Sequence, residues 1–165
     1  MPYDLSKPLV IGISSRALFN LEQENKIFEE QGVEAYEAYQ VAHENEILQK
    51  GAAFQLIKAF LKLNNTGLGR LVEVIIMSRN NANTCLRIFN SIQYYGLDIT
   101  RATLTSGAEI APYLKAFKTD LFLSANSVDV QSAINDGIAA GLILTGAAHA
   151  DAKQKIDQIR IAFDG

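Results

Sequence analysis

The chain has 165 residues, a formal net charge of −3 and a composition of 48% hydrophobic and 20% charged residues, which is typical of one globular domain with a sizeable core. No apolar run approaches the roughly 20 residues that span a bilayer, so we expect no membrane segment. The acidic balance and the lack of a Lys/Arg cluster argue against non-specific nucleic-acid binding. The start of the chain shows no secretory signal, and a cytoplasmic location is expected by default.

Short β-rich runs alternate with helical stretches along the chain, and this alternation predicts an α/β fold with a parallel, Rossmann-like sheet and flanking helices. Most of the runs are continuously apolar, as expected for strands covered on both faces. The predicted strands are Leu9 to Ile13, Leu71 to Met77, Ala102 to Thr105, Leu121 to Leu123, Gly141 to Leu144 and Ile159 to Phe163.

Helices are predicted where apolar residues recur at spacings of three and four. The four sets are Val33, Tyr36, His43 and Ile47; Phe54, Ile57 and Leu61; Cys85, Ile88 and Ile92; and Val130, Ile134 and Ile138. Asn81 and Ser127 are the predicted N-caps of the last two. The two helices within about residues 25–63 form a small insertion after the first strand, which is either a cap or plain packing.

Several motifs in the chain carry no chemistry. The glycines at 67 and 69 precede a strand, whereas a dinucleotide loop must follow one. His43 falls on an apolar stripe, which favours a packed histidine over a metal ligand. The single cysteine, Cys85, is expected to be a buried thiol without a role.

Polar residues follow the predicted strands at the edge where ligands of parallel sheets bind. The Ser78 hydroxyl can donate a hydrogen bond to a phosphate, and the N-terminus of the helix after it favours an anion. An ordinary strand-to-helix turn is an equally good interpretation of Ser78. The candidate phosphate- or nucleotide-binding residues are Ser14, Ser15, Arg16, Ser78, Arg79, Asn80, Lys115, Lys118, Ser124 and Asn126.

Several segments, in this order and spacing, resemble the amino-terminal half of the cytosolic 5'-nucleotidase type I family, within the haloacid-dehalogenase-like (HAD-like) superfamily. The resemblance covers nearly the whole chain. Its segments are residues 13–19 (ISSRALF), 31–36 (QGVEAY), 43–46 (HENE), 90–92 (NSI), 113–117 (YLKAF), 123–125 (LSA), 136–140 (DGIAA) and 161–165 (IAFDG).

The resemblance implies phosphoryl transfer to an aspartate at the end of a core strand, with a second aspartate two residues later as general acid and base and with Mg²⁺ offsetting charge. It places the nucleophile on Asp164, while the general acid would follow Gly165. It further implies a tandem of two halves, in which residues 1–158 form a divergent first copy and residues 159–165 start the catalytic half.

In this first copy, the resemblance places Ser14 and Arg16 at the positions of the aspartate pair, and Ser124 with Ala125 at the position of the metal-binding acids. Ser78 and one of Lys115 or Lys118 keep the phosphate-holding residue types. We therefore expect no metal site in this half, although the parent enzyme would need Mg²⁺.

Two functions of different class follow. The chain is either the non-catalytic part of a 5'-nucleotidase or a free-standing module that binds a nucleoside monophosphate or phosphate; a generic domain with polar turns is a third interpretation. The strand from Ile159 to Phe163 would be unpaired in this chain, so a homo-oligomer or packing against the missing second half is expected.

Overall fold

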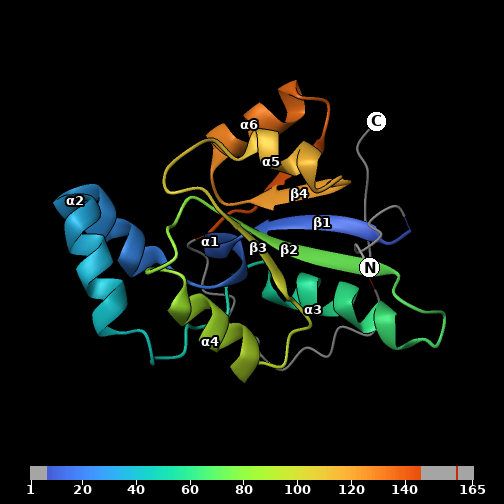
Figure 1. Ribbon diagram of the computed structural model, residues 1–165, viewed down its shortest axis with the longest axis horizontal. Coiled ribbons are helices and arrows are strands. Elements are labelled where there is room, and N and C mark those ends of the chain that lie inside the picture. The colour runs from blue at the N-terminus through green and yellow to red at the C-terminus, as the bar shows by residue number, and fades with distance from the viewer. Residues whose placement is uncertain (1–6, 146–158, 160–165) are drawn as a thin grey trace.

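The computed structural model describes residues 7–145 and 159, which form a five-stranded parallel sheet with helices on both faces (Figure 1). The strand order is β3-β2-β1-β4-β5, and every pairing is parallel. The predicted α/β fold is thereby confirmed. The strands are β1 (Leu9–Ser14), β2 (Val72–Ser78), β3 (Arg101–Leu104), β4 (Leu121–Ser124) and β5 (Ala139–Leu142).

The flanking helices form two layers, with α3 and α4 on one face of the sheet and α5 and α6 on the other (Figure 1). Because successive side chains of a strand point to opposite faces, Val74 and Ile76 of β2 pack into the first layer, and Ile75 and Met77 pack into the second. The helices are α1 (Ser15–Leu18), α2 (Glu22–Ala42), α3 (Phe54–Lys62), the 3-10 turn η1 (Leu63–Asn65), α4 (Leu86–Tyr94), α5 (Ala111–Ala116) and α6 (Ser127–Asn135).

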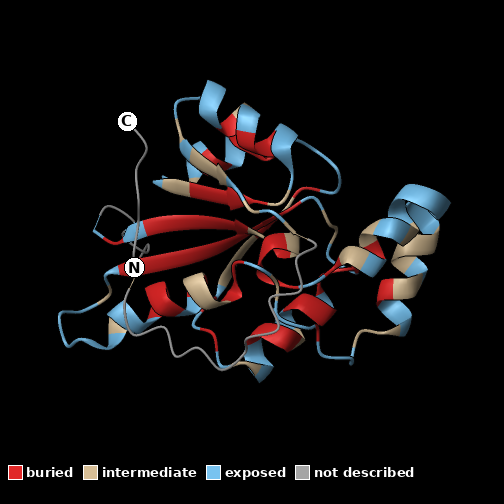
Figure 2. Cartoon of the chain, turned by 180° about the vertical axis from the view of Figure 1, so that it is seen from behind, coloured by how far each residue is buried: buried red, intermediate tan, exposed pale blue. Residues whose placement is uncertain are grey.

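The central strands are buried along nearly their whole length, whereas much of α2 is exposed (Figure 2). Helix α2 projects beyond the carboxyl edge of the sheet and bends at Gly32, whose φ of 84° and ψ of −177° suit only glycine. Helix α3, by contrast, packs into the core through Phe54 and Ile57. The segment predicted as an insertion therefore contains one helix that covers the sheet and one that extends away from it.

The boundaries differ from the predicted ones at β5. This strand covers Ala139–Leu142, two residues earlier than the predicted run from Gly141 to Leu144. Pairing with β4 sets these bounds, since Leu121 pairs with Ala139 and Ser124 pairs with Leu142. Leu144 lies outside the strand with 77% of its surface exposed, so an apolar run alone misplaced this edge strand.

The helix caps also differ from the predicted ones. Asn126, not Ser127, caps α6, because its side-chain oxygen accepts hydrogen bonds from the backbone N–H groups of Val128 and Asp129. Asn81 accepts a bond from the Thr84 N–H at 3.0 Å, and α4 begins later, at Leu86. Its side chain thus closes a turn rather than capping the helix.

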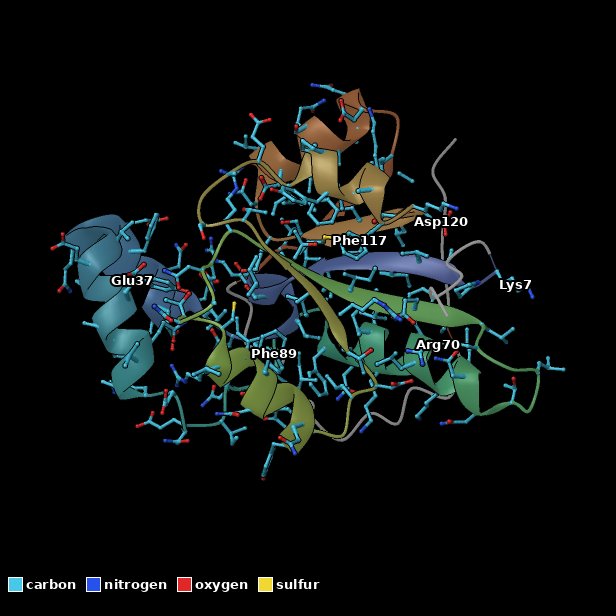
Figure 3. All side chains as sticks on the ribbon, viewed as in Figure 1. Lys7, Glu37, Arg70, Phe89, Phe117 and Asp120 are labelled. Carbon is cyan, nitrogen blue, oxygen red and sulfur yellow. The ribbon has the colours of Figure 1, made fainter. Side chains whose placement is uncertain are left out.

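A cluster of ion pairs lies at the amino end of the strands, away from α2. Glu73 of β2 is fully buried and pairs with Arg70 and with Arg101 of β3. Arg70 also contacts Asp98 at 3.0 Å. Figure 3 shows Arg70 at one end of the sheet and Glu37 of α2 at the other. This cluster ties the edge strand to the centre of the sheet.

The helices of the described residues include none that is long and apolar enough to cross a membrane.

Candidate functional site

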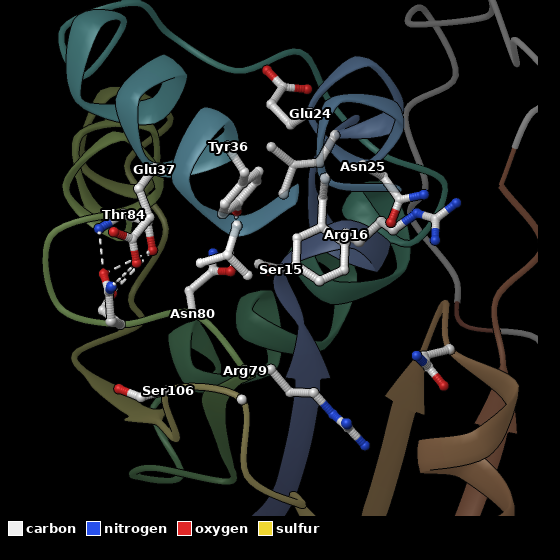
Figure 4. A pocket seen from close by; sticks show the side chains of 16 residues that line it. Ser15, Arg16, Glu24, Asn25, Tyr36, Glu37, Arg79, Asn80, Thr84 and Ser106 are labelled. Atoms are coloured by element: carbon white, nitrogen blue, oxygen red, sulfur yellow. Dashed lines mark hydrogen bonds between the residues drawn. The ribbon is translucent and has the colours of Figure 1, made fainter. Parts of the chain in front are cut away.

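A pocket of about 440 Å³ lies between the carboxyl edge of the sheet and helix α2 (Figure 4). Parallel strands bring their carboxyl ends to one edge, so the residues that follow them converge there. The strand ends contribute Ser15 and Arg16 after β1, Arg79, Asn80 and Asn81 after β2, Ser106 and Gly107 after β3, and Asn126 after β4.

Helix α2 forms the opposite wall of the pocket, with residues from both sides of its bend at Gly32. The Phe28 and Tyr36 rings meet edge to face, with centroids 5.9 Å apart. The residues that α2 and its start contribute are Leu21, Glu24, Asn25, Phe28, Val33, Tyr36 and Glu37, and Thr84 before α4 completes the lining.

Two arginines carry positive charge into the pocket, and a carboxylate orients each of them. Arg16 donates from Nε and Nη2 to the Glu22 carboxylate at 2.8 and 2.9 Å. Arg79 donates from Nε and Nη2 to Oδ1 of Asp129, which is 8% exposed. Among the described residues, none accepts a hydrogen bond from either Nη1 atom. Each guanidinium therefore retains donors for an anion.

The Arg16–Glu22 pair predicts a stability change in acid. The hydrogen bond from Arg16 lowers the pKa of the Glu22 carboxyl below its ordinary value of 4.5. A carboxyl with a lowered folded-state pKa stabilises the protein above its unfolded pKa, and this contribution is lost as the pH falls through the folded-state pKa. We expect Glu22→Gln to be less stable than the wild type at about pH 6, and we expect this difference to be smaller at about pH 3. Urea unfolding at both pH values measures this, and a gap that does not shrink in acid would contradict it.

Tyr36 and Asn80 link the aromatic wall to the strand ends. The Tyr36 hydroxyl donates to Oδ1 of Asn80 and accepts from Nε2 of Gln40, both at 3.0 Å. Burial raises the pKa of Tyr36, so the phenol stays protonated and keeps donating. Beside it, Asn81 donates to Glu37. These bonds present a set of oriented amide and hydroxyl groups to the pocket.

A buried ion pair holds α2 against α4. Arg87 donates from Nη1 to Glu24 at 2.6 Å, and its Nε donates to the Glu46 carbonyl oxygen at 2.9 Å. The side chains of Arg87 and Glu24 are only 8% and 6% exposed. Glu24 lines the pocket, but Arg87 compensates its charge. The pair therefore fixes the wall of the pocket and compensates the charge of Glu24, while Glu37 remains as a carboxylate on this wall.

Of the predicted site residues, Ser15, Arg16, Arg79, Asn80 and Asn126 line this pocket together. The other serines do not line it. Ser14 accepts hydrogen bonds from the N–H groups of Ala17 and Ala125, Ser78 accepts one from Asn80, and Ser124 accepts one from Asn126. Their hydroxyl oxygens tie the strand ends to the turns that follow.

The two predicted lysines lie elsewhere. Lys115 of α5 is 3.3 Å from Asp136 at the end of α6, with 58% of its side chain exposed, and Lys118 is exposed just after α5. Neither lines the pocket. Asp164 lies outside the described residues, so its role stays a prediction. Sequence reasoning missed the α2 residues, because an aromatic pair on a helix gives no signal of where that helix packs.

Cys85 lies beside the pocket and is 1% exposed. Burial raises the pKa of its thiol to about 12, so the thiolate is scarce at neutral pH. We expect Cys85 to react with a thiol reagent at least about 100-fold more slowly in the folded protein than in urea. The absorbance of the released thiol measures this. Equal rates in the two states would contradict the placement.

The described residues do not suit Mg²⁺. Within residues 7–145 and 159, no group of three His, Cys, Asp or Glu side chains could hold a metal ion. Three of the acids near the strand ends pair with arginines, Glu22 with Arg16, Asp129 with Arg79 and Glu24 with Arg87, and Glu37 accepts a hydrogen bond from Asn81. Mg²⁺ prefers carboxylate and water oxygens, which this arginine-rich edge does not present.

Comparison with known proteins gives the family. The sequence profile of the 5'-nucleotidase family matches residues 1–165. A human (Homo sapiens) protein, cytosolic 5'-nucleotidase 1B, is 40% identical over 164 residues, and the match covers 95% of this chain and 26% of the relative. This chain thus spans about a quarter of that relative's length. No solved structure matches the chain. Since the profile matches along the whole chain, the chain belongs to the 5'-nucleotidase family.

Proposed function

We propose that this chain is the amino-terminal part of a cytoplasmic, Mg²⁺-dependent 5'-nucleotidase that hydrolyses nucleoside 5'-monophosphates to nucleoside and phosphate, and that this part is not catalytic by itself. Family membership and the 26% coverage of the human relative support the first statement. The relative's description as cytosolic supports the location.

The chemistry of the strand ends carries the second statement. Ser14 and Ser124 stand where the resemblance to the HAD-like superfamily would place carboxylates, and both hydroxyl oxygens accept hydrogen bonds from backbone N–H groups. A serine hydroxyl needs an adjacent base to act as a nucleophile, and no such base contacts these two serines among the described residues. We assign the nucleophile to Asp164 and the general acid to a residue after Gly165.

The test is to read the coding sequence beyond Gly165 and to express and assay the longer protein that it encodes. We expect an aspartate directly after Gly165 and release of phosphate from AMP or IMP in the presence of Mg²⁺. Asp164→Asn should abolish this release, because the phosphoryl group would have no acceptor. Full activity of Asp164→Asn, or a stop codon after Gly165, would overturn the proposal.

A second candidate is a free-standing module that binds a nucleotide or phosphate without hydrolysing it. The pocket favours this function, because Arg16 and Arg79 bring two oriented guanidiniums to the carboxyl edge of the sheet. Saturable binding of inorganic phosphate to this chain, measured by calorimetry, would support it. An absence of heat at millimolar phosphate would count against it.

We also propose that the chain packs against a second copy or against the following half of its parent. Strand β5 lies at the edge of the sheet, and Leu142 is 44% exposed there. Light scattering of this chain tests the first possibility, and limited proteolysis of the parent protein tests the second. The proposal is contradicted if this chain is a monodisperse monomer and the two halves of the parent also separate after proteolysis.

A further inference from the structure

The pocket between α2 and the sheet has two chemically different ends. Arg16 and Arg79, with Asn126, stand at the strand ends, and Phe28, Tyr36 and Glu37 stand on α2. Figure 4 shows Arg16 and Arg79 away from the group of Glu37 and Thr84, with Tyr36 and Asn80 between them. A ligand that fills the pocket would meet cations at one end and, at the other, an aromatic and amide surface that also carries the Glu37 carboxylate.

We propose that this pocket binds a nucleoside monophosphate in one orientation, with its phosphate at Arg16 and Arg79 and its base against Phe28 and Tyr36. The inference rests on the proposed function in that a nucleotide is the ligand class of the family. It adds a binding site that lies in this chain and is separate from the nucleophile assigned to Asp164.

The charges support the phosphate end. Glu22 and Asp129 accept hydrogen bonds only from Nε and Nη2 of the two arginines, and Glu29 acts on Arg16 through its charge alone. The guanidiniums are therefore positioned in advance, and charge-assisted bonds from their remaining donors suit a phosphate oxygen. The side chains are 31% and 40% exposed, so solvent or a ligand can reach them.

The apolar surface supports the base end. Phe28 is 46% exposed although it lines a pocket, and Val33 beside it is 53% exposed. A planar base that covers these side chains removes apolar surface from water, and base–aromatic stacking tolerates any base. The amides of Asn80 and Asn81 line the pocket beside these side chains, held in place by their bonds to Tyr36 and Thr84.

The size of the pocket agrees with this ligand. Its 440 Å³ falls within the roughly 300–1,000 Å³ of pockets that bury a small organic ligand. Inorganic phosphate alone would fill only the arginine end and would leave the exposed Phe28 ring uncovered.

Calorimetric titration of this chain with AMP, adenosine and inorganic phosphate tests the proposal. Phe28→Ala should weaken AMP and adenosine binding about tenfold and leave phosphate binding unchanged. Arg79→Gln should weaken AMP and phosphate binding at least about tenfold and leave adenosine binding unchanged. Arg16→Gln should have the same pattern, and it serves as the second variant because the loss of Arg79 leaves the buried Asp129 unpaired.

Lys115→Gln is the matched control, since it removes one positive charge at a residue that pairs with Asp136 outside the pocket. AMP binding should be unchanged in this variant. The proposal is overturned if AMP does not bind at millimolar concentration, if Lys115→Gln weakens it as much as Arg79→Gln, or if Phe28→Ala weakens phosphate and AMP equally. Hydrolysis by the longer protein is a separate readout. If the longer protein hydrolyses AMP but this chain does not bind it, only this inference is refuted. If this chain binds AMP but the longer protein does not hydrolyse it, only the enzymatic proposal is refuted.

Discussion

Replacing Arg87 with methionine is expected to lower the free energy of unfolding by about 3–5 kcal/mol, because it leaves the Glu24 carboxylate buried without its partner. The change also removes the hydrogen bond to the Glu46 carbonyl oxygen. Since Glu24 belongs to α2 and Arg87 to α4, the wall of the pocket should loosen as well. Urea unfolding measures the loss.

The control is the double variant Arg87→Met with Glu24→Gln, in which no uncompensated charge is buried. We expect it to regain at least about half of the lost stability, because most of the cost comes from the orphaned carboxylate rather than from the missing contact. A loss under about 1 kcal/mol in the single variant would contradict the assignment of a buried ion pair. So would a double variant that is less stable than Arg87→Met alone.

Gly51→Ala is expected to cost about 3 kcal/mol or more. A Cβ atom at Gly51 would lie 2.7 Å from the carbonyl oxygen of Ala17 and 2.8 Å from the carbonyl carbons of Leu18 and Phe19. These atoms are backbone, so the clash moves helix α1, which carries Arg16 into the pocket. Thermal unfolding and AMP titration measure the two consequences.

Gly12→Ala is the comparison for this substitution. Its added Cβ would meet only side-chain atoms of Met77, Phe122 and Leu114, at 3.2 to 3.3 Å. Side chains can shift more easily than backbone, so we expect a smaller loss of stability than for Gly51→Ala. An equal or greater loss for Gly12→Ala would show that the segment around Gly51 adapts and that the contact with α1 does not constrain it.

The strands could be predicted because each central one is an apolar run covered on both faces. The continuous apolar run from Val74 to Met77 is typical of a buried central strand in an α/β fold. The edge strand β5 was misplaced because its residues, Ala139 to Leu142, are small and half-exposed, and only pairing with β4 defines them. Helix α5 was not predicted, because its six residues are too few for an apolar period.

The candidate site could be predicted only where the rule for parallel strands applies. That rule located Arg16, Arg79 and Asn126 at one edge without any knowledge of side-chain positions. It does not say which hydroxyls are used by the backbone, and the Ser124 oxygen turned inward to the Asn126 N–H. Nor can it place α2, whose position depends on the long-range pair between Glu24 and Arg87.

The central claim is that this chain binds a nucleotide at its arginines but lacks the groups to hydrolyse it. Its most direct test is phosphate release from AMP by the purified chain of residues 1–165 with Mg²⁺, under conditions in which calorimetry detects AMP binding. We predict no phosphate above the rate without protein. Release that rises with protein concentration and disappears in Ser14→Ala, Ser124→Ala or Asp164→Asn would contradict the account.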